Sequence, residues 1–168
     1  MKLDLRQLAR KPGETLPFDY ELDMTDLEWN GEKPVAAPIH VEGEVRNMAG
    51  ALLLTAQLTA KLSLVCDRCM KPFDRVKTVE FETLLASELE NGENDEIVLL
   101  DKDEQLDLDE LMGEVFILNL DTKNLCSEDC KGICPGCGAD LNKEACRCKR
   151  EIDPRLAKLA ALLEQDRT

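Results

Sequence analysis

The sequence predicts an α+β protein, with an antiparallel β-sheet or a partly closed barrel as its core, a few helices and a cysteine-rich C-terminal segment. Three observations lead to this fold class. Apolar and polar residues alternate over residues 52–64, apolar residues recur at helical spacing near residues 107–120, and most of the eight cysteines lie after residue 125. We therefore expect a mainly antiparallel β domain over residues 1–120, with one helix near 107–120, and a cysteine-rich module with a final helix over residues 121–168.

Strands are predicted where apolar residues recur at every second position. Each even position between residues 52 and 64 is apolar, and most of the intervening residues are polar. Because alternate side chains of a strand point to opposite faces, this pattern indicates a long strand with one face on a core. A similar run at residues 79–83 predicts its antiparallel partner, and residues 39–45 predict a further strand. Short strands are expected at Lys2–Leu5 and Ile97–Leu100.

Two helices are expected. The first has Asp107 or Asp109 as its N-cap and ends near residue 120. Its apolar positions, which follow helical spacing, are Leu108, Leu111, Met112, Val115 and Leu118. The second begins at Asp153-Pro154, because Asp is a good N-cap and Pro suits the first helical position.

Composition and charge limit the classes of protein to which this chain can belong. With 43% hydrophobic and 33% charged residues the chain is typical of a globular protein, and we see neither an apolar run of the ~20 residues that a membrane helix needs nor a secretory signal. We therefore expect a cytoplasmic protein without membrane contact. The net charge of −14 lies in residues 1–120, whereas residues 121–168 carry as many basic as acidic side chains. This charge disfavours a broad nucleic-acid-binding surface and favours a basic protein partner.

The cysteines are the clearest candidates for a functional site. In a reducing compartment, clustered cysteine pairs are more often metal ligands than disulfides. The most specific unit is Cys134-Pro135-Gly136-Cys137-Gly138, because a Cys-x-x-Cys turn points two sulfurs at one centre and the glycine lets the backbone approach closely. Zinc binds four such thiolates in a tetrahedron. The eight candidate zinc ligands are Cys66, Cys69, Cys126, Cys130, Cys134, Cys137, Cys146 and Cys148.

The spacing leaves the number of zinc ions, one or two, and the grouping of the ligands open. In one solution a first site consists of Cys126, Cys130, Cys134 and Cys137. The second site of that solution consists of Cys66, Cys69, Cys146 and Cys148. In the other solution one site takes Cys134 and Cys137 with Cys146 and Cys148, and the other site takes Cys66 and Cys69 with Cys126 and Cys130. Either grouping ties the predicted strand hairpin to the C-terminal segment.

Catalysis is not expected. A catalytic zinc keeps an open coordination position and usually has His or carboxylate ligands. This chain has a single histidine, His40, in a predicted strand, where a histidine is most often an ordinary surface or core residue. The sequence shows no Ser/His/Asp set, no phosphate-binding loop and no His-rich metal motif. We therefore predict that the protein is not an enzyme.

Several segments of this chain resemble a known family. They include Cys66-Asp67-Arg68-Cys69 followed by Pro72-Phe73, the run from Leu125 to Gly138, Cys146-Arg147-Cys148, and Ile152 to Ala157. In order and spacing they are similar to the YceD family of bacteria and plastids, the large ribosomal RNA subunit accumulation proteins. One departure, which we regard as minor, is Asp121, where the usual family sequence has a proline. The resemblance implies a role in accumulation or processing of large-subunit ribosomal RNA. It does not imply a catalytic activity, and it favours a structural role for the metal.

Charge and resemblance together suggest the partners. We expect the protein to engage a basic ribosomal protein or a large-subunit assembly intermediate. A local contact with ribosomal RNA is also expected from a basic patch, formed by Arg147, Lys149, Arg150, Arg155 and Lys158. Two alternatives stay open: a redox-sensitive zinc–thiolate switch, because zinc-bound thiolates can oxidise and release the metal, and a metal-dependent nuclease, which would need an open coordination position.

Overall fold

The computed structural model describes residues 1–49, 51–86, 97–100 and 104–148. Seven strands and two helices are assigned within them. In chain order the elements are β1 (Lys2–Asp4), α1 (Arg6–Ala9), β2 (Thr15–Leu22), β3 (Ile39–Met48), β4 (Ala51–Val65), β5 (Pro72–Ala86), β6 (Ile97–Leu99), β7 (Gln105–Asp107) and α2 (Leu108–Leu118). Among the described residues, none of the helices is both long and apolar enough to cross a membrane.

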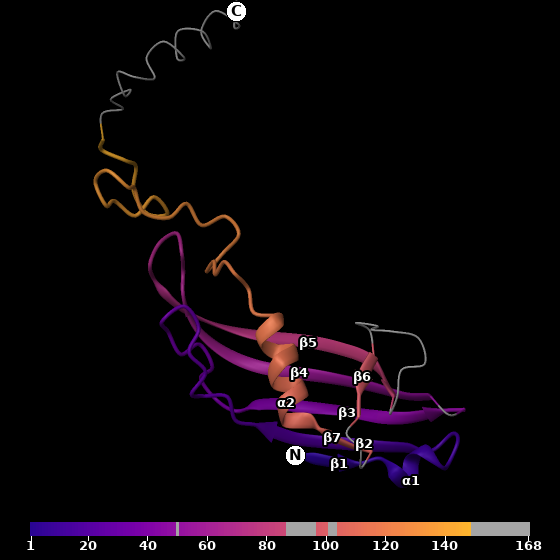
Figure 1. The fold of residues 1–168 in the computed structure, drawn as a ribbon. Coiled ribbons are helices and arrows are strands. Elements are labelled where there is room, and N and C mark those ends of the chain that lie inside the picture. Colours follow the sequence, from indigo (N-terminus) through magenta and orange to yellow (C-terminus); the bar gives the residue numbers. More distant parts are fainter. Residues whose placement is uncertain (50, 87–96, 101–103, 149–168) are drawn as a thin grey trace, which may run out of the picture.

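An open five-stranded sheet forms the body of the protein (Figure 1), in the order β2-β3-β4-β5-β6. The first four strands are antiparallel neighbours, and β6 runs parallel to β5. A separate pair, β1 with β7, joins the N-terminus to the start of α2. The predicted α+β class is therefore confirmed, with an open sheet of mixed strand direction.

One face of the sheet carries the hydrophobic core. The predicted alternation in β4 is confirmed, because Leu54 and Leu58 are fully buried on that face while Thr55 and Gln57, between them, lie on the other. Helix α2 lies across this side of the sheet (Figure 1) and contributes Phe116, the largest fully buried side chain. The sheet thus has one covered apolar face and one polar face.

Helix α2 begins where the sequence predicts. Asp107 is the N-cap, and its carboxylate accepts a hydrogen bond from the Asp109 amide at 3.2 Å. The helix ends at Leu118, and the Asn119 amide donates to the carbonyl oxygens of the last turn. The expected helix at Asp153-Pro154 lies outside the described residues.

Strand β2 is not predicted from the sequence, because Pro17 lies inside it and proline lacks the N–H that a central strand needs. In the structure β2 is an edge strand, where a missing donor is tolerated.

Phe18 of β2 packs against Gly43 of β3, the residue with which it is paired in the sheet register. A Cβ atom on Gly43 would lie 2.7 Å from the Phe18 ring and 2.2 Å from the Thr55 carbonyl oxygen.

Replacing Gly43 by alanine should therefore destabilise the sheet. The added methyl group meets backbone of β4, which cannot move without disturbing the β3–β4 ladder, and overpacking of this kind costs about 1–3 kcal/mol. Urea unfolding of Gly43→Ala against the parent protein measures the loss. Gly113→Ala is a useful comparison, because Gly113 has ordinary helical backbone and its Cβ would come no nearer than 3.7 Å, to the Met24 side chain. Equal unfolding midpoints of Gly43→Ala and the parent would contradict the prediction.

Candidate metal centre

The turn between β4 and β5 presents the first two sulfurs. Cys66 and Cys69 lie at the end of the longest hairpin of the sheet, where the Met70 amide donates to the Cys66 carbonyl oxygen at 2.8 Å and the Cys66 amide donates to the Lys71 carbonyl oxygen at 2.9 Å. Met70 has a positive φ of 57°, which closes the turn. Both sulfurs are therefore fixed by the register of the hairpin.

The chain after α2 is anchored to this hairpin by charged side chains. Asp121 accepts from Lys77 at 2.9 Å and from Arg75 at 3.4 Å, and Arg75 also donates to the Leu125 carbonyl oxygen at 2.6 Å. These three contacts hold residues 121–125 against β5. Asp121, which departs from the usual proline of the resembled family, thus has a defined role in this chain.

A second pair of contacts sets the approach of the chain to the turn. The Asn124 amide donates to the Asp67 carboxylate at 2.6 Å, and the Asp67 amide donates to the Asn124 carbonyl oxygen at 2.8 Å. Cys126 and Cys130 follow directly and face the two sulfurs of the hairpin turn. Sequence reasoning missed the roles of Asp67 and Asn124, because their contact joins residues far apart in the chain and the Cys66–Cys69 motif that contains Asp67 does not indicate its partner.

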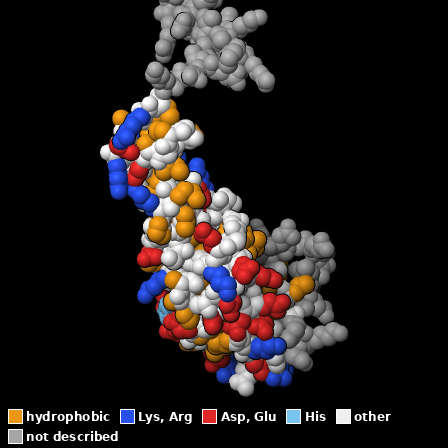
Figure 2. Space-filling model, turned by 90° about the vertical axis from the view of Figure 1, so that its left-hand side faces the viewer, with side chains coloured by type: hydrophobic (Ala, Val, Ile, Leu, Met, Phe, Trp, Pro, Cys, Tyr) orange, Lys and Arg blue, Asp and Glu red, His pale blue; other side chains and the backbone are white. Residues whose placement is uncertain are grey.

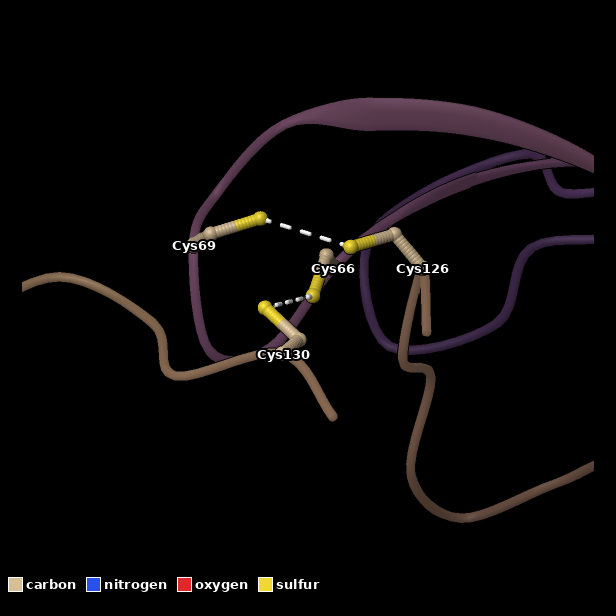
Figure 3. Close-up of side chains that lie close together, drawn as sticks. All are labelled: Cys66, Cys69, Cys126 and Cys130. Carbon is tan, nitrogen blue, oxygen red and sulfur yellow. Dashed lines mark hydrogen bonds between the residues drawn. The ribbon is translucent and has the colours of Figure 1, made fainter. Parts of the chain in front are cut away.

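The first cluster, called site A, consists of Cys66, Cys69, Cys126 and Cys130 (Figure 3). All four sulfurs lie within 4.8 Å of one another, with 3.9 Å between Cys66 and Cys130 and 3.7 Å between Cys69 and Cys126. Cys126 is exposed and the other three residues are buried. Phe73 and Leu125 pack against the three buried cysteines.

The thiols of site A have opposed tendencies to ionise. The backbone amide of Cys126, assisted by those of Cys69 and Arg68, lowers the pKa of Cys66 to about 6. The neighbouring sulfurs of Cys66 and Cys69 raise the pKa of Cys126 to about 12. One thiolate forms easily, whereas four thiolates so close together require a compensating cation.

The second cluster, called site B, consists of Cys134, Cys137, Cys146 and Cys148. The Cys134 sulfur lies 3.3 Å from that of Cys146 and 3.7 Å from that of Cys148. The backbone amides of Cys137 and Gly136 lower the pKa of Cys134 to about 6, whereas the sulfurs of Cys137 and Cys134 raise the pKa of Cys148 to about 12. Only Cys134 of these four is buried.

Both clusters fit a tetrahedral metal ion. Bonds of about 2.3 Å from zinc to four sulfurs give a tetrahedron with edges of about 3.8 Å. The sulfur–sulfur distances of site A are close to that value, and all eight cysteines are free thiols. A Cβ on Gly136 would lie 2.7 Å from the Cys148 sulfur, so site B closes only around a glycine. Of the two groupings left open by the sequence, the structure forms the one that pairs Cys66 and Cys69 with Cys126 and Cys130.

The predicted basic patch lies only partly within the described residues. Arg147 is described; its side chain is 78% exposed and pairs with Glu144 at 2.6 Å. Lys149, Arg150, Arg155 and Lys158 lie outside the described residues.

His40 lies on the polar face of the sheet. Its ring nitrogens lie 3.3 Å from Glu21, 3.7 Å from Asp19 and 3.8 Å from Glu42. These carboxylates are exposed, and the histidine is partly exposed. Such a group of acidic side chains around a histidine is common on protein surfaces without any bound ion.

Comparison with known proteins gives one family match. The family described as "Large ribosomal RNA subunit accumulation protein YceD" matches residues 54–163. This range contains most of the β4–β5 hairpin, α2 and all eight cysteines. No solved structure was found to match the chain.

Several curated relatives match most of the chain. The uncharacterized protein YlbN of Bacillus subtilis is 26% identical over 99% of this chain and 98% of its own length. The uncharacterized protein Rv2926c of Mycobacterium tuberculosis is 27% identical over 97% of this chain and 81% of its own length. A chloroplastic protein of Arabidopsis thaliana, named large ribosomal RNA subunit accumulation protein YCED homolog 1, is 22% identical over 70% of this chain and 46% of its own length.

Proposed function

The chain belongs to the YceD family of large ribosomal RNA subunit accumulation proteins, and from this premise we propose that it is a non-catalytic, cytoplasmic accessory factor in large ribosomal subunit biogenesis. The family name implies a role in the accumulation of large-subunit ribosomal RNA. The observation that carries the proposal is the family match over residues 54–163, which includes most of the β4–β5 hairpin and both cysteine clusters.

Zinc is the metal that the two sites suit best. Four thiolates per site and a tetrahedral arrangement are typical of structural zinc, which leaves no open position for a substrate. Site A would be held by sulfurs from the β4–β5 turn and from the chain after α2, so a bound ion would tie two distant parts of the chain together. Site B would be held entirely by residues 134–148. A structural ion in each site supports an accessory protein that acts by binding and not by catalysis.

The polar face of the sheet supports a basic partner. A groove of about 710 Å³ crosses this face. Its carboxylate-bearing lining residues, from β2, β3 and β5, are Asp19, Glu42, Glu44, Glu80 and Glu82. The ion pairs found for them within the described residues are those of Asp19 and Glu42 with His40. Figure 2 shows Asp and Glu gathered over the lower body and Lys and Arg prominent on the narrower part above it.

An uncompensated acidic surface attracts a lysine- and arginine-rich chain over a distance of about a Debye length. Ribosomal proteins contain such basic segments, and so do assembly intermediates of the large subunit. We propose that the acidic groove is the surface that binds them. Ribosomal RNA would be repelled by this face, so a local RNA contact is assigned to the basic patch that includes Arg147.

Depletion and sedimentation test the function itself. Cells depleted of this protein should contain less large-subunit ribosomal RNA, with the small-subunit RNA as internal control. The tagged protein should co-sediment with large-subunit precursors in sucrose gradients. Unchanged large-subunit RNA on depletion would refute the proposed role.

Reversing charge in the groove tests the partner surface. The double substitution Glu80→Lys and Glu82→Lys should weaken association with large-subunit precursors by about tenfold or more, because it turns attraction into repulsion along the β5 side of the groove. Glu110→Lys with Glu114→Lys changes the net charge equally, but on an exposed part of α2. Equal loss in the two double variants would show that net charge alone matters and would contradict the assignment of the groove.

A second candidate function is a redox-sensitive zinc switch, favoured by the exposure of Cys137, Cys146 and Cys148 in site B. Two thiolates would transfer two electrons to one hydrogen peroxide, forming a disulfide and two hydroxide ions and releasing the metal. Zinc release measured under mild peroxide tests this candidate, and retention of both ions at physiological oxidant levels would eliminate it.

A further inference from the structure

The two clusters are in direct contact through Arg68, which lies between Cys66 and Cys69. Its side chain donates to the Cys130 carbonyl oxygen at 2.7 Å and to the Glu128 carbonyl oxygen at 3.2 Å. Its own carbonyl oxygen accepts from the Ile133 amide at 2.9 Å. Arg68 therefore contacts Cys130 of site A through its side chain, and Ile133, next to Cys134 of site B, through its backbone.

The contact leaves little room for rearrangement. Gly132 has a φ of 76°, and a Cβ at that position would lie 2.6 Å from the Arg68 carbonyl oxygen. The backbone at Gly132, between the two sites, therefore packs directly against the backbone of Arg68 in the site A turn. On the other side, Leu141 donates to the Gly132 carbonyl oxygen at 2.9 Å and Ile133 forms a bridge with Asp140, which continues the connection into site B.

Asn142 makes a second connection between the clusters. Its side-chain amide donates to the Cys130 sulfur at 3.6 Å, and its side-chain oxygen accepts from the Lys131 amide at 2.7 Å. The same amide group also donates to Asp140 at 3.0 Å. Asn142 lies in the loop between the two cysteine pairs of site B, so folding of that loop places a hydrogen-bond donor on a ligand sulfur of site A.

An ion pair also joins the two clusters. Lys71, just after the site A turn, pairs with Asp140 of the site B loop. Lys71 lowers the pKa of Asp140 to about 2, with help from the Asn142 amide, so the carboxylate is charged throughout the physiological range. Arg68, Lys71, Gly132, Asp140 and Asn142 thus form one continuous interface between the two clusters.

We propose that the two sites bind metal cooperatively, and that Arg68 and Asn142 are the positioning residues that couple them. The proposal rests on the metal binding put forward above and adds its regulation. A metal ion in site B orders residues 134–148 and so positions Asn142 and Asp140 for their contacts with site A. A metal ion in site A fixes Cys130 and the turn that contains Arg68, and so positions the carbonyl oxygen that the Ile133 amide contacts. Because coupling between two sites is reciprocal, each ion raises the affinity of the other by the same factor.

The coupling factor can be measured with three proteins. A Cys146→Ser, Cys148→Ser variant retains site A alone, and a Cys66→Ser, Cys69→Ser variant retains site B alone. Competition with a chromophoric chelator gives the zinc association constant of each remaining site and the product of the two constants for the parent protein. The product for the parent, divided by the product for the isolated sites, is the coupling factor, which we expect to be about tenfold or more.

Asn142→Ala, introduced into the parent protein and into both cysteine variants, identifies the coupling residue without removing a ligand. Asn142→Ala should lower the coupling factor at least about threefold, with two zinc ions still bound. Lys143→Ala, at the adjacent exposed position, serves as the control and should leave the factor unchanged. Exchange of the Ile133 amide hydrogen should also be faster in the variant without site A, because its acceptor is the Arg68 carbonyl oxygen in the site A turn.

The possible outcomes distinguish failure of the proposed cooperativity from failure of the metal binding on which it rests. Two ions bound with a coupling factor of one would overturn cooperativity and leave metal binding intact. A parent protein that binds no zinc at all would overturn metal binding itself. An equal effect of Asn142→Ala and Lys143→Ala on the coupling factor would show that Asn142 does not couple the two sites.

Discussion

Replacing Cys66 by serine should remove the metal from site A and detach the cysteine-rich segment from the sheet. Cys66 is fully buried, and its sulfur lies 3.9 Å from that of Cys130. Loss of a residue that only supports a ligand typically costs 10–100-fold in metal affinity, and loss of a ligand costs more. We therefore expect the zinc content after dialysis to fall from two ions to one or fewer.

Two measurements check this expectation. Elemental analysis gives the zinc bound per chain, and limited proteolysis shows whether residues 121–130 become accessible once site A is empty. Met70→Ala is a matched control in the same turn, since Met70 is 63% exposed and offers no metal ligand of comparable strength. The circular dichroism of the sheet should be kept, because site A lies at the end of the hairpin and not in the main core. An unchanged zinc content in Cys66→Ser would contradict the assignment of this ligand.

The second large effect is expected at Phe116. This side chain is fully buried between α2 and the sheet, and its truncation leaves a cavity that the surrounding leucines cannot fill. Phe→Ala substitutions in such positions cost about 3–5 kcal/mol, a large part of the stability of a domain of this size. Urea unfolding followed by circular dichroism should show the loss directly.

Leu118 of the same helix provides the control. Its side chain is 83% exposed, so Leu118→Ala should change the free energy of unfolding by less than about 0.5 kcal/mol. Similar losses in Phe116→Ala and Leu118→Ala would contradict the assignment of the loss to burial against the sheet, because helix propensity by itself favours alanine at both positions.

Much of the body could be predicted from local patterns. The alternation in β4 and its Cys-x-x-Cys turn predict a hairpin, and the hairpin is present with the expected face buried. Asp107 is the cap of α2, because a carboxylate before a run of helical apolar residues satisfies a free backbone amide. These elements depend on short-range spacing, which a sequence shows directly.

Other parts could not be predicted because they depend on contacts between distant residues. Strand β2 contains a proline, and only its place at the edge of the sheet makes that acceptable. Asp121 departs from a usual proline, yet in the structure it receives Arg75 and Lys77 of β5 and anchors the chain beside site A. The sequence indicates no role for Asn142, and its role follows only from its proximity to the Cys130 sulfur.

The sequence alone determined that eight cysteines are available in pairs, that their residue types suit zinc, and that the acidic charge lies before residue 121. Only the tertiary structure decided which four sulfurs meet. The reason is that a tetrahedral site depends on positions in space: the end of the β4–β5 hairpin and the chain after α2 converge on one centre, whereas residues 134–148 close on another. Spacing along the chain is compatible with both groupings, and the packing of α2 and Asp121 against the sheet selects one.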